Sequence, residues 1–260
     1  MNNQIKRKPG LRLSKNFFAR LLLFWGEYHR PMLLVFITFA LIGLLQSLRP
    51  ETRRILLTGF LAQRSLIILL FIFCLLTLSL LWSAGQRLDT WIFIRLNLRG
   101  RHPLWLDWAM WILTQIGNGG VGILLGIFLY FFGDRRLAVE MLLGILSLWL
   151  AVELIKAMVE RSRPFLTLEG TRIIGWRERG KSFPSGHTSQ AFFMMTLLVH
   201  HHEPHATIGL LLYFTAGLVG LTRIYVGAHY PRDVVGGAIL GSVWGIFTSL
   251  IEVYLKTGTF

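Results

Sequence analysis

Long apolar runs separated by short polar stretches constrain this sequence more than any other feature. A helix that crosses a bilayer needs roughly 20 predominantly apolar residues, within a range of about 17–25. Runs of this kind cover residues 32–48, 66–84, 104–132, 137–159, 187–199, 208–226 and 234–255. Only 15% of the 260 residues are charged, which is too few for the water-exposed surface of a soluble domain. The sequence therefore predicts an all-α, polytopic transmembrane helical bundle with six or seven spans.

The charge of the chain is strongly basic, with 27 Lys and Arg residues against 13 Asp and Glu residues. The first twenty residues carry several of these cations and no acidic residue. A segment of this kind is typical of a cytoplasmic tail on anionic lipid, and we favour this role over nucleic-acid binding. A cleavable signal peptide is not expected, because no small-residue cleavage site follows. We predict a basic segment over 1–30, N-terminal transmembrane helices over 31–85 and a second transmembrane domain over 86–255.

Two polar clusters in the second half of the chain have no explanation in hydrophobicity. Lys156 and Arg163 lie seven residues apart, which is two helical turns, so we expect both on one helix face. Ser185, Gly186 and His187 come directly before an apolar run. Serine favours the N-cap of a helix, and glycine lets backbone N–H groups approach a ligand closely. These features predict an anion site at the start of a helix.

A third polar cluster joins the end of one apolar run to the start of the next. It contains Arg223, His229 and Asp233. Pro231 favours the first position of a helix, which places Asp233 in the first turn and within reach of His229. Counting the spans brings all three clusters to the same end of the bundle.

Together these clusters provide the groups that phosphoryl transfer without a metal requires. Three fixed cations and helix-terminal N–H groups predict a pocket for a multiply charged anion, most simply a phosphate. One imidazole attacks the phosphorus, a carboxylate orients that imidazole, and the second imidazole protonates the departing oxygen. The cations stabilise the charge on the equatorial oxygens.

The order and spacing of the clusters resemble the tripartite signature of the type 2 phosphatidic acid phosphatases. The three parts read Lys156-x6-Arg163-Pro164, then Pro184-Ser185-Gly186-His187, then Arg223-x5-His229-x3-Asp233. The family is membrane-bound, metal-independent and works through a phosphohistidine, so the resemblance implies a catalytic domain over 86–255 with no cofactor and no metal. It implies His229 as nucleophile, Asp233 as its orienting partner, His187 as general acid, and Lys156, Arg163, Ser185, Gly186 and Arg223 as phosphate-binding residues.

The expected function is an integral membrane phosphatase that acts on a lipid phosphate or prenyl diphosphate. Candidate substrates are undecaprenyl diphosphate, phosphatidylglycerol phosphate, phosphatidic acid and lipid A. Two alternatives stay open: a lipid phosphotransferase with the same phosphohistidine, and a transporter that binds an anionic solute with the same cations. Membrane lipids are the expected surroundings, no nucleic-acid partner is expected, and the oligomeric state is left open.

The expected location is a bacterial inner membrane with the active site facing the periplasm, by resemblance to the bacterial family members. With seven spans this orientation would put the basic N-terminal segment in the periplasm, against the positive-inside rule. Three explanations stay open: one N-terminal segment does not cross, most simply near residues 55–63; the run 104–132 breaks differently; or the catalytic face is cytoplasmic. The histidines at 200, 201, 202 and 205 are interpreted as a solvated turn in preference to a metal site, and Cys74 as a packed hydrophobe.

Overall fold

A computed structural model describes residues 50–99 and 102–256, together with positions 36, 39, 42, 43, 46 and 47. The chain divides into two units, Met1–Arg49 and Pro50–Phe260. The predicted basic segment 1–30 and, apart from those isolated positions, the predicted span 32–48 lie outside the described residues. All helices named in the following paragraphs belong to the second unit.

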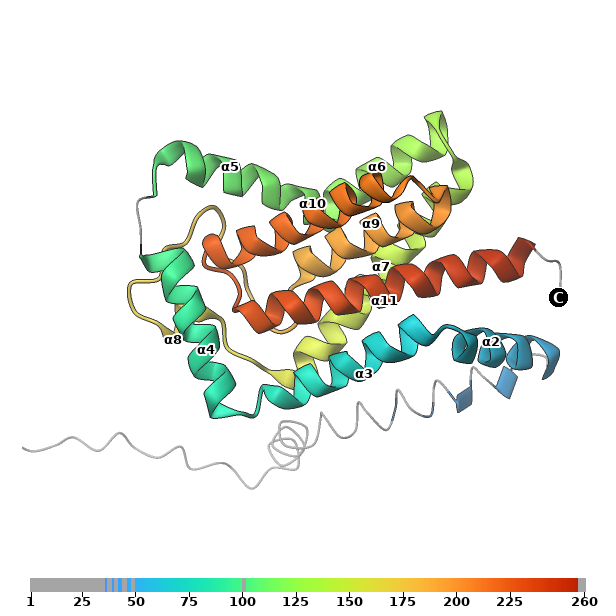
Figure 1. Cartoon of the computed structure of the whole chain (residues 1–260), viewed down its shortest axis with the longest axis horizontal. Coiled ribbons are helices and arrows are strands. Elements are labelled where there is room, and N and C mark those ends of the chain that lie inside the picture. Colours follow the sequence, from blue (N-terminus) through green and yellow to red (C-terminus); the bar gives the residue numbers. More distant parts are fainter. Residues whose placement is uncertain are drawn as a thin grey trace, which may run out of the picture. The chain divides into compact units, whose positions relative to one another are not determined.

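The second unit is helical, and its described residues contain no strand, which confirms the predicted all-α class (Figure 1). The helices are α2 (Pro50–Ala62), α3 (Arg64–Ser79), α4 (Ser83–Phe93), α5 (Leu104–Thr114), α6 (Gly119–Phe132), α7 (Arg135–Val159), α8 (Pro164–Thr167), α9 (Gly186–His202), α10 (Ala206–Tyr225) and α11 (Pro231–Lys256). A π-helical turn, Ile94–Leu98, continues α4, and a 3₁₀ turn, Gln115–Gly117, joins α5 to α6.

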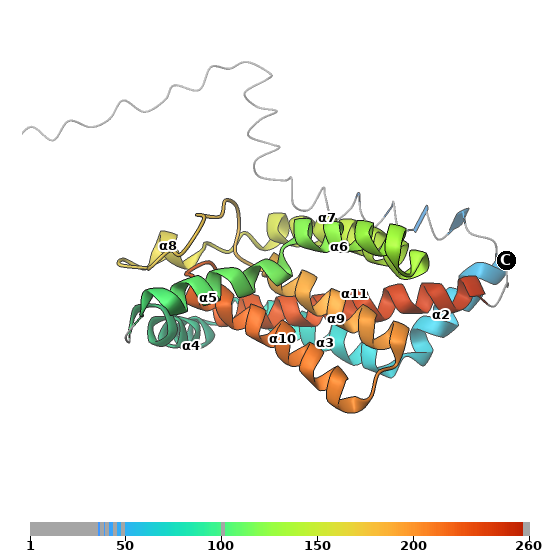
Figure 2. The same cartoon turned by 90° about the horizontal axis from the view of Figure 1, so that it is seen from above.

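Helix α9 forms the centre of the bundle and packs along α11, α10 and α7 (Figures 1 and 2). Its contact with α11 is close because three glycines of α11 face it at intervals of four residues. A Cβ atom on Gly237 would lie 2.6 Å from the carbonyl oxygen of Ser185, the N-cap of α9. One on Gly241 would lie 2.1 Å from the carbonyl oxygen of Ser189, and one on Gly245 would lie 2.6 Å from Thr196 Cβ. Small residues at this spacing let two helix backbones approach each other, as in many membrane helix pairs.

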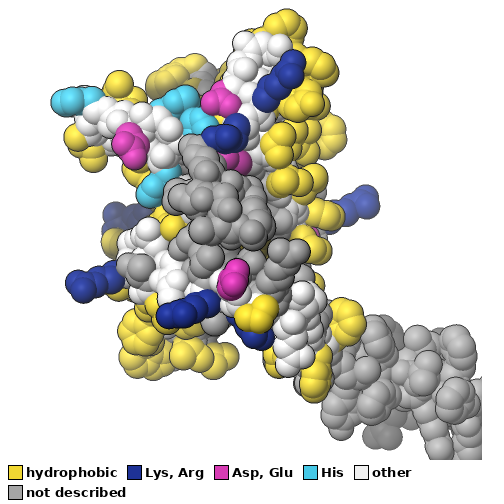
Figure 3. All heavy atoms as spheres, turned by 90° about the vertical axis from the view of Figure 1, so that its right-hand side faces the viewer, with side chains coloured by type: hydrophobic (Ala, Val, Ile, Leu, Met, Phe, Trp, Pro, Cys, Tyr) yellow, Lys and Arg dark blue, Asp and Glu magenta, His cyan; other side chains and the backbone are white. Residues whose placement is uncertain are grey.

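The outer faces of the bundle carry exposed apolar side chains, as expected for a surface in contact with lipid. Examples are Leu124 and Phe128 on α6, Trp149 on α7, and Leu210 and Phe214 on α10. Hydrophobic side chains also cover the flanks in the space-filling view (Figure 3). Three described helices are long and apolar enough to cross a membrane, or five if each of two bent pairs crosses as one span.

Both bent pairs fall where the sequence predicts a continuous apolar run. The run 66–84 breaks after Ser79, and α4 leaves α3 at an angle of 93°. The run 104–132 bends by 56° at Asn118, whose side chain caps α6 by accepting a hydrogen bond from Gly120 N at 2.8 Å. At this bend a Cβ on Gly117 would lie 2.3 Å from the carbonyl oxygen of His187, so only glycine fits against the start of α9.

The predicted helical face shared by Lys156 and Arg163 is wrong, because α7 ends between them. Glu160 adopts a left-handed conformation (φ 51°) at the C-cap of α7, and Arg163 is extended (ψ 155°) directly before Pro164. A residue before proline disfavours the helical region, which explains the extended Arg163. The chain then enters the loop 168–185, which lies with α4 and α5 at one end of the bundle (Figure 1).

Candidate active site

Two buried arginines from different elements bind one carboxylate at this end of the bundle. Arg163 precedes α8 and is 1% exposed, and Arg223 lies in the last turn of α10 and is 3% exposed. Arg163 Nη1 donates to Glu178 Oε2 at 2.8 Å, and Arg223 Nη2 donates to Glu178 Oε1. Glu178 comes from the loop 168–185, so the residue that joins the two arginines was absent from the predicted site.

The two imidazoles of the predicted site face the same carboxylate. His187 Nδ1 lies 3.6 Å from Glu178 Oε1, and His229 Nε2 lies 3.6 Å from Glu178 Oε2. We call Arg163, Arg223, His187, His229 and Glu178 the anion cluster. Its four nitrogen-bearing side chains surround one anionic group, which is the arrangement that the sequence predicts for a phosphate.

His229 presents its two ring nitrogens to different partners. Nε2 lies 3.3 Å from Arg163 Nη1, on the side of the anion cluster. Nδ1 lies 3.7 Å from Asp233 Oδ2, and Asp233 is in the first turn of α11, as Pro231 predicts. A proton on Nδ1 faces the Asp233 carboxylate and leaves Nε2 free to act as an acceptor or nucleophile.

Lys156 and Gly186 reach the cluster from the other side. They line a cavity of about 560 Å³ together with Arg163, Glu178 and His187. Lys156 Nζ donates to Glu153 Oε1 at 2.8 Å. A Cβ atom on Gly186 would lie 4.0 Å from Lys156 Nζ.

Ser185 occupies the N-cap position of α9, but its side chain makes no capping hydrogen bond. Instead, Ser185 Oγ accepts a hydrogen bond from Thr188 Oγ1 at 2.9 Å. Its backbone N–H donates to the carbonyl oxygen of Asp233 at 2.9 Å, which joins the start of α9 to the first turn of α11.

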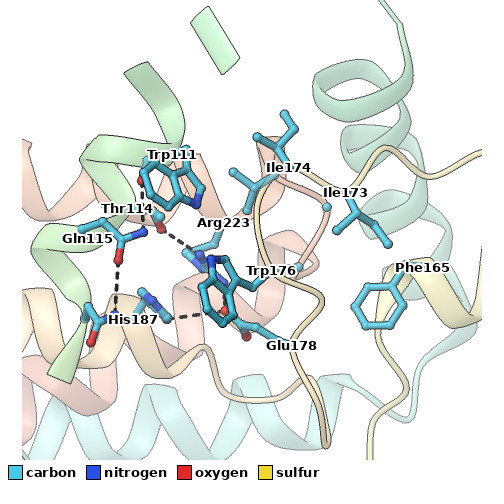
Figure 4. A pocket seen from close by; sticks show the side chains of 14 residues that line it. Trp111, Thr114, Gln115, Phe165, Ile173, Ile174, Trp176, Glu178, His187 and Arg223 are labelled. Atoms are coloured by element: carbon cyan, nitrogen blue, oxygen red, sulfur yellow. Dashed lines mark hydrogen bonds and ion pairs between the residues drawn. The ribbon is translucent and has the colours of Figure 1, made fainter. Parts of the chain in front are cut away.

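A second cavity, of about 410 Å³, opens on the other side of Glu178 (Figure 4). Arg223 and His187 point into it, and Arg223 Nη1 donates to Thr114 Oγ1 of α5 at 2.8 Å. Apolar side chains line the rest of this cavity, including Trp111 of α5 and Trp176 of the loop. The charged groups therefore lie between two partly apolar cavities that share Glu178 and His187.

The electrostatics of Glu178 follow from these contacts. Burial by itself would raise the pKa of the Glu178 carboxyl, but the contact with His229 and the positive charge of Arg223 lower it far below its ordinary value. Glu178 is therefore ionised at neutral pH, and the anion cluster binds a negatively charged group in this structure.

Asp233 has a further partner that the sequence interpretation missed. Arg161 Nη1 donates to Asp233 Oδ1 at 2.6 Å, and Arg161 Nη2 binds Asp89 of α4. The Arg161 side chain is 9% exposed and the Asp89 side chain 2%. Two features of the sequence could have drawn attention to this pair: Arg161 lies two residues before Arg163, and Asp89 follows Leu88 between two of the apolar runs. Neither feature shows that Arg161 and Asp89, 72 positions apart, come into contact.

The histidines at 200, 201, 202 and 205 lie at the opposite end of α9, where imidazoles gather at one corner of the bundle (Figure 3). We call them the histidine turn. His201 Nε2 lies 3.0 Å from Asp134 Oδ2. Among the described residues, no group of three or more His, Cys, Asp or Glu side chains is arranged to hold a metal ion.

Comparisons with known proteins agree on one family. A family model described as the PAP2 superfamily matches residues 137–256. The bacitracin transport permease protein BcrC of Bacillus licheniformis is 38% identical over 85 residues, which cover 33% of this chain and 40% of that protein. The undecaprenyl-diphosphatase of Sulfolobus acidocaldarius is 29% identical over 147 residues, which cover 56% of this chain and 69% of that protein. The match thus spans well under two thirds of the first relative's length.

Two solved structures extend the similarity over most of the second unit. The crystal structure of a transmembrane PAP2 type phosphatidylglycerolphosphate phosphatase from Bacillus subtilis has a TM-score of 0.62 at 25% identity, covering 74% of this chain and 98% of that one. The crystal structure of LpxE from Aquifex aeolicus has a TM-score of 0.55 at 34% identity, covering 62% of this chain and 94% of that one.

Proposed function

This chain belongs to the PAP2 superfamily of membrane lipid phosphatases, and we propose that it removes a phosphate from a lipid phosphate or prenyl diphosphate through a phosphohistidine on His229. One observation carries the proposal: two buried arginines and two imidazoles converge on a single carboxylate. A substrate phosphate would displace Glu178 and meet the same donors, because a phosphoryl group offers the same bidentate acceptors as a carboxylate.

The proposed reaction has two steps. His229 Nε2 attacks the terminal phosphorus, the bond from phosphorus to the leaving oxygen breaks, and His187 gives its proton to that oxygen. His187 then takes a proton from a water molecule that attacks the phosphohistidine, which breaks the P–N bond and releases inorganic phosphate. Arg163, Arg223 and Lys156 stabilise the charge on the phosphoryl oxygens in both steps, with the Ser185 hydroxyl and the Gly186 backbone N–H assisting.

The position of the site supports a lipid substrate. The cavity beside Lys156 is also lined by Ile123 of α6 and by Ile145 and Trp149 of α7, and both helices expose apolar side chains. We place the protein in an inner membrane with this end facing the periplasm. Named functions of the relatives support three substrate classes: undecaprenyl diphosphate, phosphatidylglycerol phosphate and lipid A.

The test is a single-turnover reaction of the detergent-solubilised full chain with a lipid labelled in its terminal phosphate, in the presence of EDTA. The expected result is an acid-labile phosphoryl-protein in the native chain and none in His229→Gln. A panel of the three lipid classes and phosphatidic acid then ranks substrates by kcat/KM. Activity that EDTA abolishes, or a label that persists in His229→Gln, would contradict the mechanism.

The same experiment separates the two alternatives. A phosphotransferase would pass the label to an added lipid alcohol faster than to water. A transporter would bind the anion without labelling the protein. We test this alternative because the Bacillus licheniformis relative is named a transport permease. We expect the label to appear as inorganic phosphate.

A further inference from the structure

The Asp233 carboxylate is fully buried, and each of its oxygens has different partners. Oδ2 accepts from the Ser182 hydroxyl and from Tyr230 N at 2.8 Å, and faces His229 Nδ1 at 3.7 Å. Oδ1 accepts from Arg161 Nη1 at 2.6 Å. His229 Nδ1 has no hydrogen-bond partner in the described part of the chain, so Asp233 Oδ2 is the group placed to receive its proton.

Arg161 is fixed at both branches of its guanidinium group. One branch binds Asp233, and the other binds Asp89 and, at 2.8 Å, Gln86 Oε1, both from α4. The guanidinium carbon also lies 4.5 Å from the centre of the Tyr230 ring, a distance typical of a cation–π contact. Arg161 thus connects α4 to the carboxylate behind His229.

This arrangement decides which way the Asp233 carboxylate is turned. Rotation about the last torsion of an aspartate side chain is soft, with broad minima. Without a donor on Oδ1, the carboxylate is free to turn and share the Ser182 and Tyr230 donors between its two oxygens. Such a rotation moves Oδ2 away from His229 Nδ1.

We propose that Arg161 is a positioning residue for the phosphoryl-transfer reaction: it holds Asp233 Oδ1, so that Oδ2 stays in front of His229 Nδ1, and α4 anchors it through Asp89 and Gln86. This inference rests on the proposed function, because it assigns Arg161 a role through the proposed nucleophile. Arg161 lies behind Asp233 and its side-chain bonds go to Asp233, Asp89 and Gln86, so it acts on the rate without touching the phosphate.

A second arginine in the same network provides a matched control. Arg232 Nε binds Asp89 Oδ2 at 2.7 Å, and Arg232 Nη2 lies 3.3 Å from Gln86 Oε1. Its remaining guanidinium bonds go to Ser79 at the end of α3. Arg232 therefore shares the α4 anchor of Arg161, while its side-chain bonds do not reach the Asp233 carboxylate. A purely structural role predicts similar effects for the loss of either arginine.

The test compares Arg161→Met, Arg161→Lys and Arg232→Met in the full chain, measuring kcat, KM and the inhibition constant for vanadate. For Arg161→Met we expect kcat to fall by about 10- to 100-fold, by analogy with the outer partners that orient metal-bound histidines. KM and the vanadate constant should change by less than about twofold, since the anion cluster is intact. Arg161→Lys keeps one donor for Asp233 and should recover part of kcat, while Arg232→Met should lower Tm but keep kcat.

A double variant completes the test. In an Asp233→Asn background, Arg161→Met should lower kcat no further, because its effect passes through Asp233. Equal kcat values for Arg161→Met and the native chain, or equal losses for Arg161→Met and Arg232→Met, would overturn the inference. If Arg161→Met does not fold, Arg161→Lys replaces it. A native kcat in Arg161→Lys, or a loss in Arg161→Lys that adds in full to the loss from Asp233→Asn in the double variant, overturns the inference. Failure of the proposed function is a separate outcome, seen as a native chain that forms no phosphohistidine.

Discussion

The anion cluster and the histidine turn lie at opposite ends of α9, and both combine imidazoles with carboxylates. In the anion cluster, His229 is 1% exposed and lies between Arg163 and Asp233. In the histidine turn, the His201 side chain is 10% exposed and pairs with Asp134, whose side chain is 46% exposed. The two ends differ mainly in the exposure of the carboxylate partner and in the cations: within the part of the chain that the structure describes, only the first end has guanidinium groups buried against the imidazoles.

This comparison shows why residue type alone does not identify a site. Burying a charged group is unfavourable unless partners offset the loss of water, so buried arginines need a specific anionic partner. The anion cluster meets this requirement with Glu178 here, and with a phosphate in the proposed reaction. The Asp134 carboxylate of the ion pair at the histidine turn is exposed to solvent, and ion pairs of this kind contribute little to the stability of a protein.

The sharpest contrast should follow from the loss of one imidazole at each end. His229→Gln removes the proposed nucleophile, so we expect phosphate release to fall by about 10⁴-fold or more. His201→Gln should keep kcat within about twofold, because the histidine turn takes no part in the reaction. Both are measured as phosphate release by the solubilised protein. Comparable losses in the two variants would mean that the contrast between the ends has no functional meaning.

The next effect concerns the geometry of the guanidinium group. Arg163→Lys keeps the charge but not the bidentate fork, so we expect kcat/KM to fall by about 10²- to 10³-fold, as for the loss of one preorganised donor. The control is Arg135→Lys at the opposite end, where Arg135 stacks near the Tyr130 ring. Native kcat/KM in Arg163→Lys would show that charge alone suffices in the anion cluster.

A smaller effect, of opposite sign, is expected for the carboxylate that fills the cluster. Glu178→Gln removes a negative charge that competes with incoming anions, so vanadate should inhibit about tenfold more strongly. The measurement is the inhibition constant for vanadate, with Glu203→Gln at the opposite end as control. Weaker inhibition in Glu178→Gln would mean that Glu178 assists anion binding.

The smallest effect should come from the cap of α7 beside the histidine turn. Asp134 Oδ1 accepts from Arg136 N at 2.8 Å and from Leu137 N at 3.2 Å. Asp134→Ala should cost about 1 kcal/mol of helix stability, seen as a lower Tm with native kcat. A large loss of activity in this variant would connect the histidine turn to the reaction.

The sequence predicts local structure well, but it does not predict contacts between residues far apart in the chain. The helices α7, α10 and α11 begin and end close to the apolar runs, because hydrophobic length determines where a helix crosses a membrane. The sequence also predicts that Asp233 lies near His229. The two residues are four positions apart, and Pro231 between them starts the helix, so this prediction depends only on local sequence. The bend at Asn118 falls within the run 104–132, where the sequence allows a break. Its angle of 56° depends on the packing of Gly117 against His187, which no local pattern encodes.

The missed site residues have the same physical cause. Glu178 lies in a loop without periodicity, and its position depends on arginines from two other elements. Arg161 meets Asp89 across 72 residues of sequence, and no local pattern encodes that pairing. The left-handed Glu160, which moves Arg163 away from the face of Lys156, precedes a proline by four residues and looks helical by composition.

The contact of α3 and α4 with α11 determines which fragments of the protein can be expressed in a folded state. Phe73 of α3 stacks on Phe183 with ring centres 5.9 Å apart, and Arg232 at the start of α11 binds both Ser79 and Asp89. A fragment limited to the matched segment 137–256 would leave Arg232 without these partners and uncover an apolar side of α11. Such a fragment is expected to aggregate, and a soluble preparation in detergent should begin before residue 64.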